Sequence, residues 1–363
     1  MEYLLFNNIE FYHAPISSFE LPIMQWYGLF YFLFKYICRN TIIMQHVLVV
    51  GGFGFLGRYI AAELLSQQFR VTVSDIRSDS PGFAPEIQAI THDFGMAPES
   101  ESILLLKRFD VVVFCGGRDD RSLPDGDAWD FFYKANVVAT LQLTRLSSEA
   151  GVKKLVIMGS YFAYFNRIMP QMQLTKHHPY VRSRVEQEKQ CIAAAEGGLQ
   201  VIVLEIPYVF GALQGVVPLW KSLVRYINKT PIVFYTTGGT AFISVRNLAQ
   251  AVAGSILYAK HGDCIPVAGK NMTWKEMIKL IAKALDKKKP VISLTWWMIQ
   301  PLTLFLKLHF KLKGVQSGLD PYYFIRMQCK KTYIDTEFCS SYLHFEPENL
   351  DWVFADTVEA CMK

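Results

Sequence analysis

A tyrosine and an arginine four residues apart are the groups in this sequence best suited to proton chemistry. The run Pro179-Tyr-Val-Arg-Ser-Arg184 places Tyr180 and Arg184 on one face of an expected helix, where the guanidinium can stabilise a phenolate. Ser160 ends an earlier apolar run and can orient a substrate oxygen. These groups suit hydride transfer at a secondary alcohol. We therefore predict that Ser160, Tyr180 and Arg184 are catalytic.

A glycine-rich turn gives this chemistry its context. The run His46-Val-Leu-Val-Val-Gly-Gly-Phe-Gly-Phe-Leu-Gly57 is an apolar strand followed by the glycine spacing that wraps a dinucleotide pyrophosphate. We expect Gly52 to make the tight turn, Gly54 to let the backbone approach the phosphates, and Gly57 to pack the next helix, expected over 58–67. The N-terminus of that helix would face the pyrophosphate.

A carboxylate ends the next expected strand, Arg70–Asp75, about 20 residues further on. Asp75 would accept hydrogen bonds from ribose hydroxyls and repel a 2′-phosphate, which favours NAD. Arg77 could pair with that phosphate, so NADP stays open as the cofactor.

Alternating strands and helices over 46–210 predict the elements that position these residues. Further strands are expected over 87–91, 109–115, 154–158 and 199–206, and helices over 127–151 and 180–195. This alternation is typical of a doubly wound parallel sheet. We predict an α/β Rossmann fold, with an NAD(P)-binding domain at 44–210 and a smaller substrate-binding lobe at 211–363, interleaved with it.

From Met44 onward the chain resembles an extended short-chain dehydrogenase/reductase of the NAD-dependent epimerase/dehydratase family. The matching segments are 51–57, Asp93, 135–140, 159–164, 207–211 and 243–251. The resemblance implies that Asp93 contacts adenine and that Asn136 props the active-site helix. The cofactor-binding residues predicted from the residue patterns and from this resemblance together are Gly51, Gly52, Phe53, Gly54, Phe55, Leu56, Gly57, Asp75, Arg77, Asp93, Cys115, Gly116, Gly117, Asn136, Tyr180, Arg184 and Pro207.

Two positions depart from the family pattern. The family usually has lysine where this chain has Arg184, and arginine is frequent at the position of Glu205. Arginine keeps the positive charge but holds its proton too tightly to join a relay. Either the proton path is altered, or the chain is a catalytically weak NAD(P)-binding structural or assembly protein. Glu205 is interpreted as a solvated or locally paired acid.

The substrate lobe loosely resembles the 3β-hydroxysteroid dehydrogenase branch, in an apolar stretch at 291–310 followed by 332–335 and 342–347. The primary hypothesis is therefore an oxidoreductase acting on a sterol-like or other lipophilic small molecule, and the alternative is a nucleotide-sugar epimerase or dehydratase. Lys residues flank the 291–310 segment, and it contains adjacent tryptophans. It could be a buried helical hairpin, a segment lying in a membrane surface, or the apolar wall of a lipophilic pocket.

Composition excludes other classes of protein. The chain has 363 residues, 51% of them hydrophobic, a formal net charge of +5 and no long basic stripe, so a nucleic-acid partner is not expected. Seven cysteines without a C-x-x-C pair argue against a disulfide framework or a zinc site. We expect a cytoplasmic location, with membrane-surface contact and homodimer formation left open. Metal binding by His177 and His178 is not expected, since we place them on a solvated loop.

Residues 1–43 are predicted to be an apolar extension distinct from the fold. The stretch 24–38 is strongly apolar but short for a membrane span. It could be an interfacial anchor with Lys35 and Arg39 on the cytoplasmic side, or sequence ahead of a start at Met44. A secretory signal is less favoured, because its basic residues would precede the apolar run.

Overall fold

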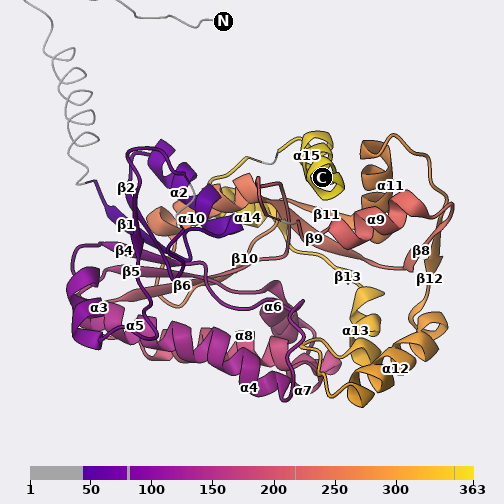
Figure 1. Ribbon diagram of the computed structural model, residues 1–363, viewed down its shortest axis with the longest axis horizontal. Coiled ribbons are helices and arrows are strands. Elements are labelled where there is room, and N and C mark those ends of the chain that lie inside the picture. The colour runs from indigo at the N-terminus through magenta and orange to yellow at the C-terminus, as the bar shows by residue number, and fades with distance from the viewer. Residues whose placement is uncertain (1–43, 80–81, 217, 347) are drawn as a thin grey trace, which may run out of the picture. The chain divides into compact units, whose positions relative to one another are not determined.

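A computed structural model describes residues 44–79, 82–216, 218–346 and 348–363, which hold a central parallel sheet of seven strands (Figure 1). Its strands are β1 (His46–Val50), β2 (Arg70–Asp75), β3 (Gln88–Thr91), β4 (Val111–Phe114), β5 (Lys154–Met158), β6 (Gln200–Glu205) and β10 (Cys264–Pro266). Their order across the sheet is β10-β6-β5-β4-β1-β2-β3, and all neighbours run parallel. The chain reverses its direction of travel through the sheet between β1 and β4, which is where doubly wound folds bind ligands.

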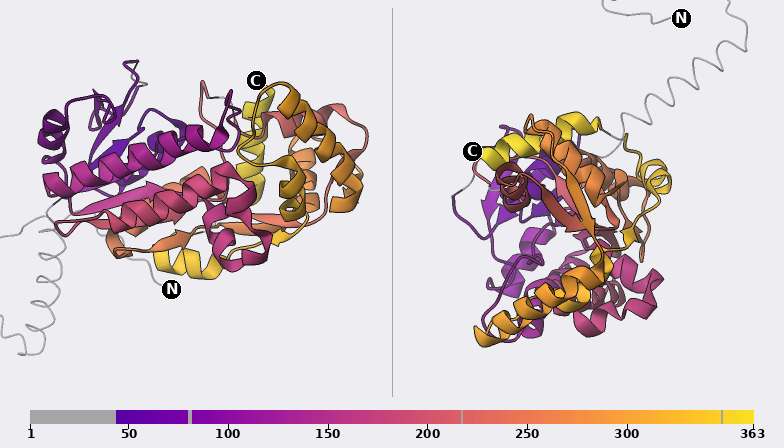
Figure 2. Two further views of the ribbon diagram at one scale, coloured as in Figure 1. Left: turned by 90° about the horizontal axis from the view of Figure 1, so that it is seen from below. Right: turned by 90° about the vertical axis from the view of Figure 1, so that its right-hand side faces the viewer.

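Helices cover both faces of this sheet, which is why its inner strands are almost continuously apolar. One face packs against α2 (Phe55–Ser66), α10 (Val245–Tyr258) and α14 (Thr336–Leu343). The other face packs against α3 (Glu99–Leu106), α5 (Ala139–Ala150) and α8 (Pro179–Ala193), as Figure 2 shows from two further sides. The predicted α/β Rossmann fold is confirmed.

The expected elements agree with the observed ones except at two places. The helix expected over 127–151 is α4 (Ala128–Phe132), a π-helical segment (Tyr133–Val138) and then α5, and it ends as expected at Gly151, which has a φ of +78°. The aromatic stretch after Ser160, for which no element was predicted, forms α6 (Tyr161–Ile168). A 3-10 turn (Pro170–Met172) and α7 (Leu174–His177) then lead into α8.

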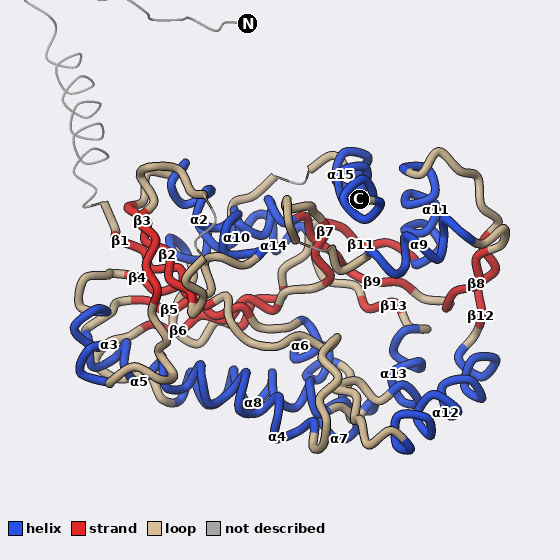
Figure 3. The backbone as a smooth tube through the Cα atoms, in the orientation of Figure 1, coloured by secondary structure: helices blue, strands red, loops and turns tan. Residues whose placement is uncertain are grey.

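The remaining elements form a smaller lobe, called the substrate lobe after the prediction above, and its strands are separate from the large sheet in Figure 3. They are β7 (Tyr208–Phe210), α9 (Lys221–Lys229), β8 (Val233–Thr236), β9 (Gly239–Ser244), β11 (Lys270–Thr273), α11 (Trp274–Ala284), β12 (Val291–Leu294), α12 (Trp296–Leu312), α13 (Pro321–Gln328), β13 (Lys331–Thr332) and α15 (Leu350–Met362). Phe210, Phe242 and Phe354 form the centre of the lobe core.

The chain after residue 211 does not remain in the lobe. Strand β10 adds to the edge of the large sheet beside β6, and α10 packs against α2. No helix in the described ranges combines the length and apolar character that a membrane crossing requires. The predictions for residues 1–43 lie outside the described residues.

Candidate active site

The glycine turn between β1 and α2 forms a narrow backbone cradle. Gly51 has a φ of +79°, so Gly51 is the residue of this turn with a left-handed backbone conformation. A Cβ on Gly52 would lie 2.6 Å from the Val73 Cβ, and one on Gly57 would lie 2.6 Å from the Gly51 carbonyl oxygen. Gly52 and Gly57 therefore let the turn lie directly on β2 and against the first turn of α2.

Helix α2 presents its N-terminus to this cradle without a side-chain cap. Gly54 is the N-cap residue, and the first turn contains no acidic residue. Its free N–H groups can therefore bind an anion, and no carboxylate competes for them. These features fit the pyrophosphate of a dinucleotide.

Asp75 lies at the carboxyl end of β2, next to the turn. Its Oδ2 accepts a hydrogen bond from the Phe53 backbone N–H at 3.1 Å, and its two oxygens accept from Arg77 Nε and Nη2 at 3.0 and 3.2 Å. Burial opposes ionisation of Asp75, but the bonds from Arg77 and Phe53 outweigh it and lower the pKa of the carboxyl. Asp75 and Arg77, the two residues that bear on the choice between NAD and NADP, are therefore paired with each other.

Asp93 lies at the same edge of the sheet. It follows β3 by two residues, and Asp75 pairs in register with Thr91 at the end of that strand. One Asp93 oxygen accepts from the Gly95 N–H at 2.9 Å. This position suits the contact with adenine that the resemblance implies.

The loop after β4 forms the floor beside the glycine turn. A Cβ on Gly51 would lie 3.2 Å from the Cys115 carbonyl carbon and the Gly116 nitrogen, so turn and loop touch. Gly117 has a φ of +110°, and a Cβ there would lie 2.7 Å from Asn136 Oδ1. Burial raises the pKa of the Cys115 thiol to about 12, which fits a structural thiol better than a nucleophile.

Asn136 connects this loop to the active-site helix. It is completely buried on the π-helical segment, where Oδ1 accepts from the Arg118 N–H at 2.8 Å. Its Nδ2 donates to the Arg118 carbonyl and to Ser183 Oγ in α8, both at 3.2 Å. Asn136 therefore holds the loop and helix α8 together, which is the propping role that the resemblance implies.

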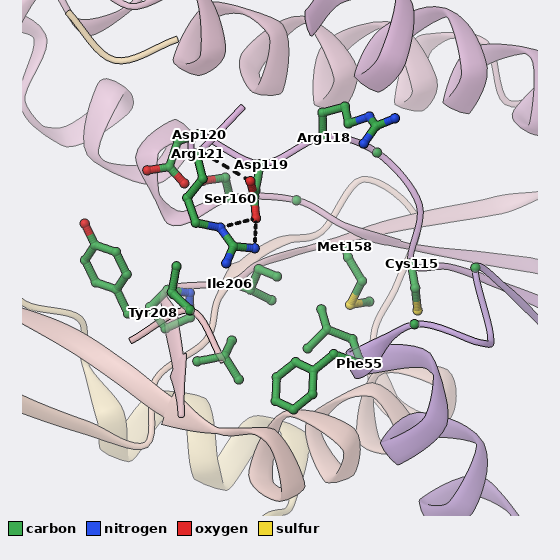
Figure 4. A pocket seen from close by; sticks show the side chains of 18 of the residues that line it. Phe55, Cys115, Arg118, Asp119, Asp120, Arg121, Met158, Ser160, Ile206 and Tyr208 are labelled. Atoms are coloured by element: carbon green, nitrogen blue, oxygen red, sulfur yellow. Dashed lines mark hydrogen bonds and ion pairs between the residues drawn. The ribbon is translucent and has the colours of Figure 1, made fainter. Parts of the chain in front are cut away.

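The three predicted catalytic residues line one pocket of about 450 Å³. Figure 4 shows this pocket, with Ser160 labelled. Arg184 Nε donates to Tyr180 Oη at 3.3 Å, as their spacing on α8 predicts. Both side chains are almost completely buried. Ser160 caps the N-terminus of α6, where its Oγ accepts from the Phe162 N–H at 3.4 Å.

Arg184 is held by three further contacts. Its Nη1 donates to Gln187 Oε1 at 2.9 Å and to the Met158 carbonyl at 3.3 Å, and its Nη2 donates to the Arg118 carbonyl at 3.4 Å. Gln187 Nε2 in turn donates to Thr140 Oγ1 at 2.8 Å. The guanidinium is therefore a fixed charge beside the phenol.

The same pocket extends from the cofactor cradle to the substrate lobe. Its lining on the cradle side includes Gly51, Gly54, Phe55, Leu56, Gly57, Cys115, Gly116 and Gly117. Pro207 follows β6 and lines the pocket between the two sides. The lobe contributes Leu213, Val216, Pro218, Leu219 and Trp220. A cofactor and a substrate would meet at Ser160 and Tyr180, and the lobe wall beside them is apolar.

Comparison with known proteins places this geometry in a family. A model of the NAD dependent epimerase/dehydratase family matches residues 47–263, more than half of the chain. The chain belongs to the NAD-dependent epimerase/dehydratase family. The sterol-4-alpha-carboxylate 3-dehydrogenase, decarboxylating, of Bos taurus is 25% identical over 225 residues, covering 59% of this chain and 60% of the bovine protein.

A second curated relative has another activity. The bifunctional UDP-glucose 4-epimerase and UDP-xylose 4-epimerase 3 of Arabidopsis thaliana is 26% identical over 292 residues, covering 68% of this chain and 83% of that protein. The UDP-glucuronic acid 4-epimerase of Bacillus cereus, solved with NAD, shares the fold at 16% identity, with a TM-score of 0.63 over 87% of this chain and 98% of that one. The predicted family and its NAD dependence are confirmed, and the findings support an extended short-chain dehydrogenase/reductase.

The sequence analysis did not predict a charged cluster that lines the pocket of this chain. Asp119, Asp120 and Arg121 follow the β4 loop, and Arg121 Nε donates to Asp119 Oδ2 at 2.7 Å. Burial, and then the charge of Asp119, raise the pKa of Asp120 to about 6. Their position just after a strand end at the ligand edge of the sheet was the signal that could have found them.

Glu205 is locally paired, not solvated. It is completely buried at the end of β6, and Arg167 donates to its two oxygens at 2.8 and 2.6 Å. Arg167 Nη1 also donates to Glu188 at 3.2 Å. The positive charge beside Glu205 is therefore supplied by Arg167 on α6.

The prediction of a solvated histidine loop was wrong. His178 is buried at the start of α8 and its Nδ1 accepts from the Asp320 N–H at 3.0 Å, while His177 stacks on Tyr323 with ring centroids 3.6 Å apart. Both histidines therefore hold α13 against the active-site helix. The described residues contain no cluster of three or more His, Cys, Asp or Glu side chains arranged for a metal.

The buried-hairpin interpretation of the 291–310 segment is wrong. Most of its residues belong to α12, where Thr303 is the buried residue, so the segment is not a buried hairpin. None of its residues lines the pocket described above, so it is not the wall of that pocket.

Proposed function

We propose that this chain is an NAD-dependent oxidoreductase that interconverts a secondary alcohol and a ketone on a lipophilic, sterol-like substrate. The observation that carries the proposal is the Tyr180–Arg184 contact, next to Ser160, in a pocket that continues into the glycine cradle. The cradle fits a dinucleotide because its glycines leave no side chain between backbone and ligand.

The residues of the chain handle the proton and the substrate oxygen. NAD, when bound in the cradle, supplies hydride exchange. Tyr180 Oη takes the hydroxyl proton during oxidation and returns it during reduction, while Ser160 Oγ donates a hydrogen bond to the same substrate oxygen. Arg184, 3.3 Å from Tyr180 Oη, stabilises the negative charge left on the phenol.

Arginine at position 184 changes how the proton leaves the site. A guanidinium does not release its proton near neutral pH, so Arg184 acts electrostatically and not as a relay member. Its bonds to Gln187 and to the Met158 and Arg118 carbonyls hold the guanidinium in place beside Tyr180. We therefore assign Arg184 to holding charge beside Tyr180, and the proton must pass from Tyr180 through solvent in the pocket.

The apolar lobe wall supports a lipophilic substrate. The lobe residues that line the pocket are aliphatic residues, glycine, proline, tryptophan and one tyrosine, Tyr208, so they offer no positive charge for a diphosphate. The basic side chains that line it, Arg118, Arg121 and Arg184, come from the β4 loop and α8, and Arg121 is paired with Asp119. The sterol dehydrogenase relative is consistent with this assignment.

A nucleotide-sugar epimerase is the second candidate, because the Arabidopsis relative matches over 83% of its own length. Purified protein and NAD would be mixed with hydroxysteroids, sterol carboxylates or UDP-sugars in separate reactions. The absorbance of the reduced nicotinamide and the formation of sugar products would be followed. Reduction of NAD in the presence of a hydroxysteroid supports the proposal. Conversion of a UDP-sugar without net reduction supports the epimerase, and NAD binding without turnover on any substrate supports the binding protein.

A further inference from the structure

Helix α12 has its apolar residues on the outside. Nine of its large apolar side chains are between 38% and 88% exposed, and they are Trp296, Trp297, Met298, Leu302, Leu304, Phe305, Leu306, Leu308 and Leu312. The residues turned toward the rest of the protein include Thr303, which is buried, and Lys307, which pairs with Asp320 at 2.7 Å. This is the reverse of the polarity that a helix facing water has.

The exposed apolar side chains of α12 are gathered on one helix and not scattered singly over the surface. Single exposed apolar residues are normal, but contiguous apolar faces mark a surface that something covers. Helix α12, orange in the right-hand view of Figure 2, lies at the outside of the lobe and packs against α13. Among the described residues, no element covers its outer side, as the exposures show.

The segment of the chain that contains this face carries a net positive charge. Residues 287–331 contain nine lysines and arginines and one acid, a formal charge of +8, whereas the whole chain carries +5, so all other residues together carry −3. The acid, Asp320, is already paired with Lys307. Lys311 and Lys313 at the end of α12 are exposed and form no ion pair with a described residue.

We propose that α12 lies in the surface of a membrane that contains anionic lipids, with its outer face among the acyl chains. Adjacent tryptophans at the start of the helix and lysines at its end are the groups that anchor a helix at the headgroup level. Anionic headgroups complement the charge of +8, while two copies of this chain meeting through the same face would bring two such charges together. The charge thus favours lipid over a second copy.

The link between α12 and α13 fixes this surface to the active site. Gly318 O accepts from the Tyr180 N–H at 3.0 Å, and Gln316 Oε1 accepts from the Ala128 N–H at 3.0 Å. The Asp320 N–H donates to buried His178. A membrane bound to α12 therefore has a set orientation relative to α8, whatever substrate the pocket takes.

Hydroxyl-radical footprinting of the full chain tests the proposal site by site. Phosphatidylcholine vesicles, with or without phosphatidylserine, would be added, and oxidation of Trp297, Met298 and Phe305 followed by mass spectrometry. We expect vesicles with phosphatidylserine to lower this oxidation several-fold and to leave Trp352 unchanged, since Trp352 on α15 is 78% exposed. Unchanged oxidation at α12 would overturn the proposal.

Two other outcomes would assign the face to another occupant and also overturn the proposal. Protection that rises with protein concentration in the absence of lipid would make the face an interface between copies. Protection at every concentration without lipid would mean that another part of the chain covers it.

Variants give a second, independent measurement. The triple variant L302Q/F305Q/L308Q removes three exposed side chains, and its vesicle partition coefficient in co-sedimentation should fall about a hundredfold or more. The matched control W352Q should partition like the wild type. K311E/K313E should lose mainly the preference for phosphatidylserine, and added salt should weaken wild-type binding. A triple variant that keeps wild-type partition and wild-type footprints would contradict the proposal.

Discussion

Replacing Arg167 with methionine removes the cation from the buried carboxyl pair behind the active-site strands. Glu205 is completely buried, Glu188 nearly so, and Arg167 donates to both. Breaking a buried ion pair by deleting one partner costs about 3–5 kcal/mol. The Arg167 side chain is 44% exposed, and solvent screens it, so we expect the free energy of unfolding to fall by about 2–3 kcal/mol at neutral pH.

The loss should grow with pH. Burial, and then the Glu205 carboxylate, raise the pKa of Glu188, and burial raises the pKa of Glu205 even with Arg167 present. Without the guanidinium, the folded state retains a proton that the unfolded state releases. The contribution of that proton to the free energy of unfolding is fully present below the pKa of glutamate in the unfolded chain, about 4.3. It is lost as the pH rises, by up to about 1.4 kcal/mol per pH unit for each proton.

Urea unfolding of R167M, R167M/E205Q and wild type across about pH 5 to 8 measures this directly. We expect the double variant, which removes one of the two buried acids, to recover most of the stability and to lose the additional pH dependence. A destabilisation of R167M below about 1 kcal/mol, or one that stays constant with pH, would refute the reasoning.

Three further perturbations test other parts of the account. Asp75→Ala frees Arg77 for a 2′-phosphate, so the ratio of NADP to NAD affinity should rise about tenfold, measured by fluorescence titration; an unchanged ratio would contradict the assignment. Gly57→Ala forces a Cβ to within 2.6 Å of the Gly51 carbonyl and should weaken NAD binding about tenfold in calorimetry, while Gly82→Ala, with open space around it, should not. Burial lowers the pKa of His178 from the usual histidine value of about 6.5 to about 4, so the unfolded state binds the proton first as the pH falls. The free energy of unfolding of wild type should therefore fall by about 3 kcal/mol between about pH 6.5 and about pH 4, and urea unfolding of His178→Gln should show a smaller loss over the same range.

The cofactor half of the site could be predicted from sequence because its signals are local. A strand, three spaced glycines and an acid at the end of the next strand all lie within 46–75. The residue types at these positions directly indicate the backbone geometry that they allow. The same holds for Tyr180 and Arg184, whose spacing by one helical turn sets their contact. The left-handed backbone conformation of Gly51 could be seen only in the structure.

The features that sequence reasoning missed depend on distant partners. Arg167 and Glu205 are 38 residues apart, and His178 and Asp320 are 142 apart, so neither pairing has a local signal. Helix α12 was ambiguous for another reason. A nearly continuous apolar run fits a buried helix and an exposed one equally well, and only packing shows which side faces out.

The central claim is that Tyr180 exchanges the proton in an NAD-dependent reaction at a carbinol carbon. Steady-state kinetics of wild type and Tyr180→Phe with the best substrate of the panel, together with NAD titration of both proteins, test it most directly. We predict that the variant loses at least about a thousandfold in kcat while its NAD affinity stays within about twofold of wild type. A variant that keeps wild-type kcat would contradict the account.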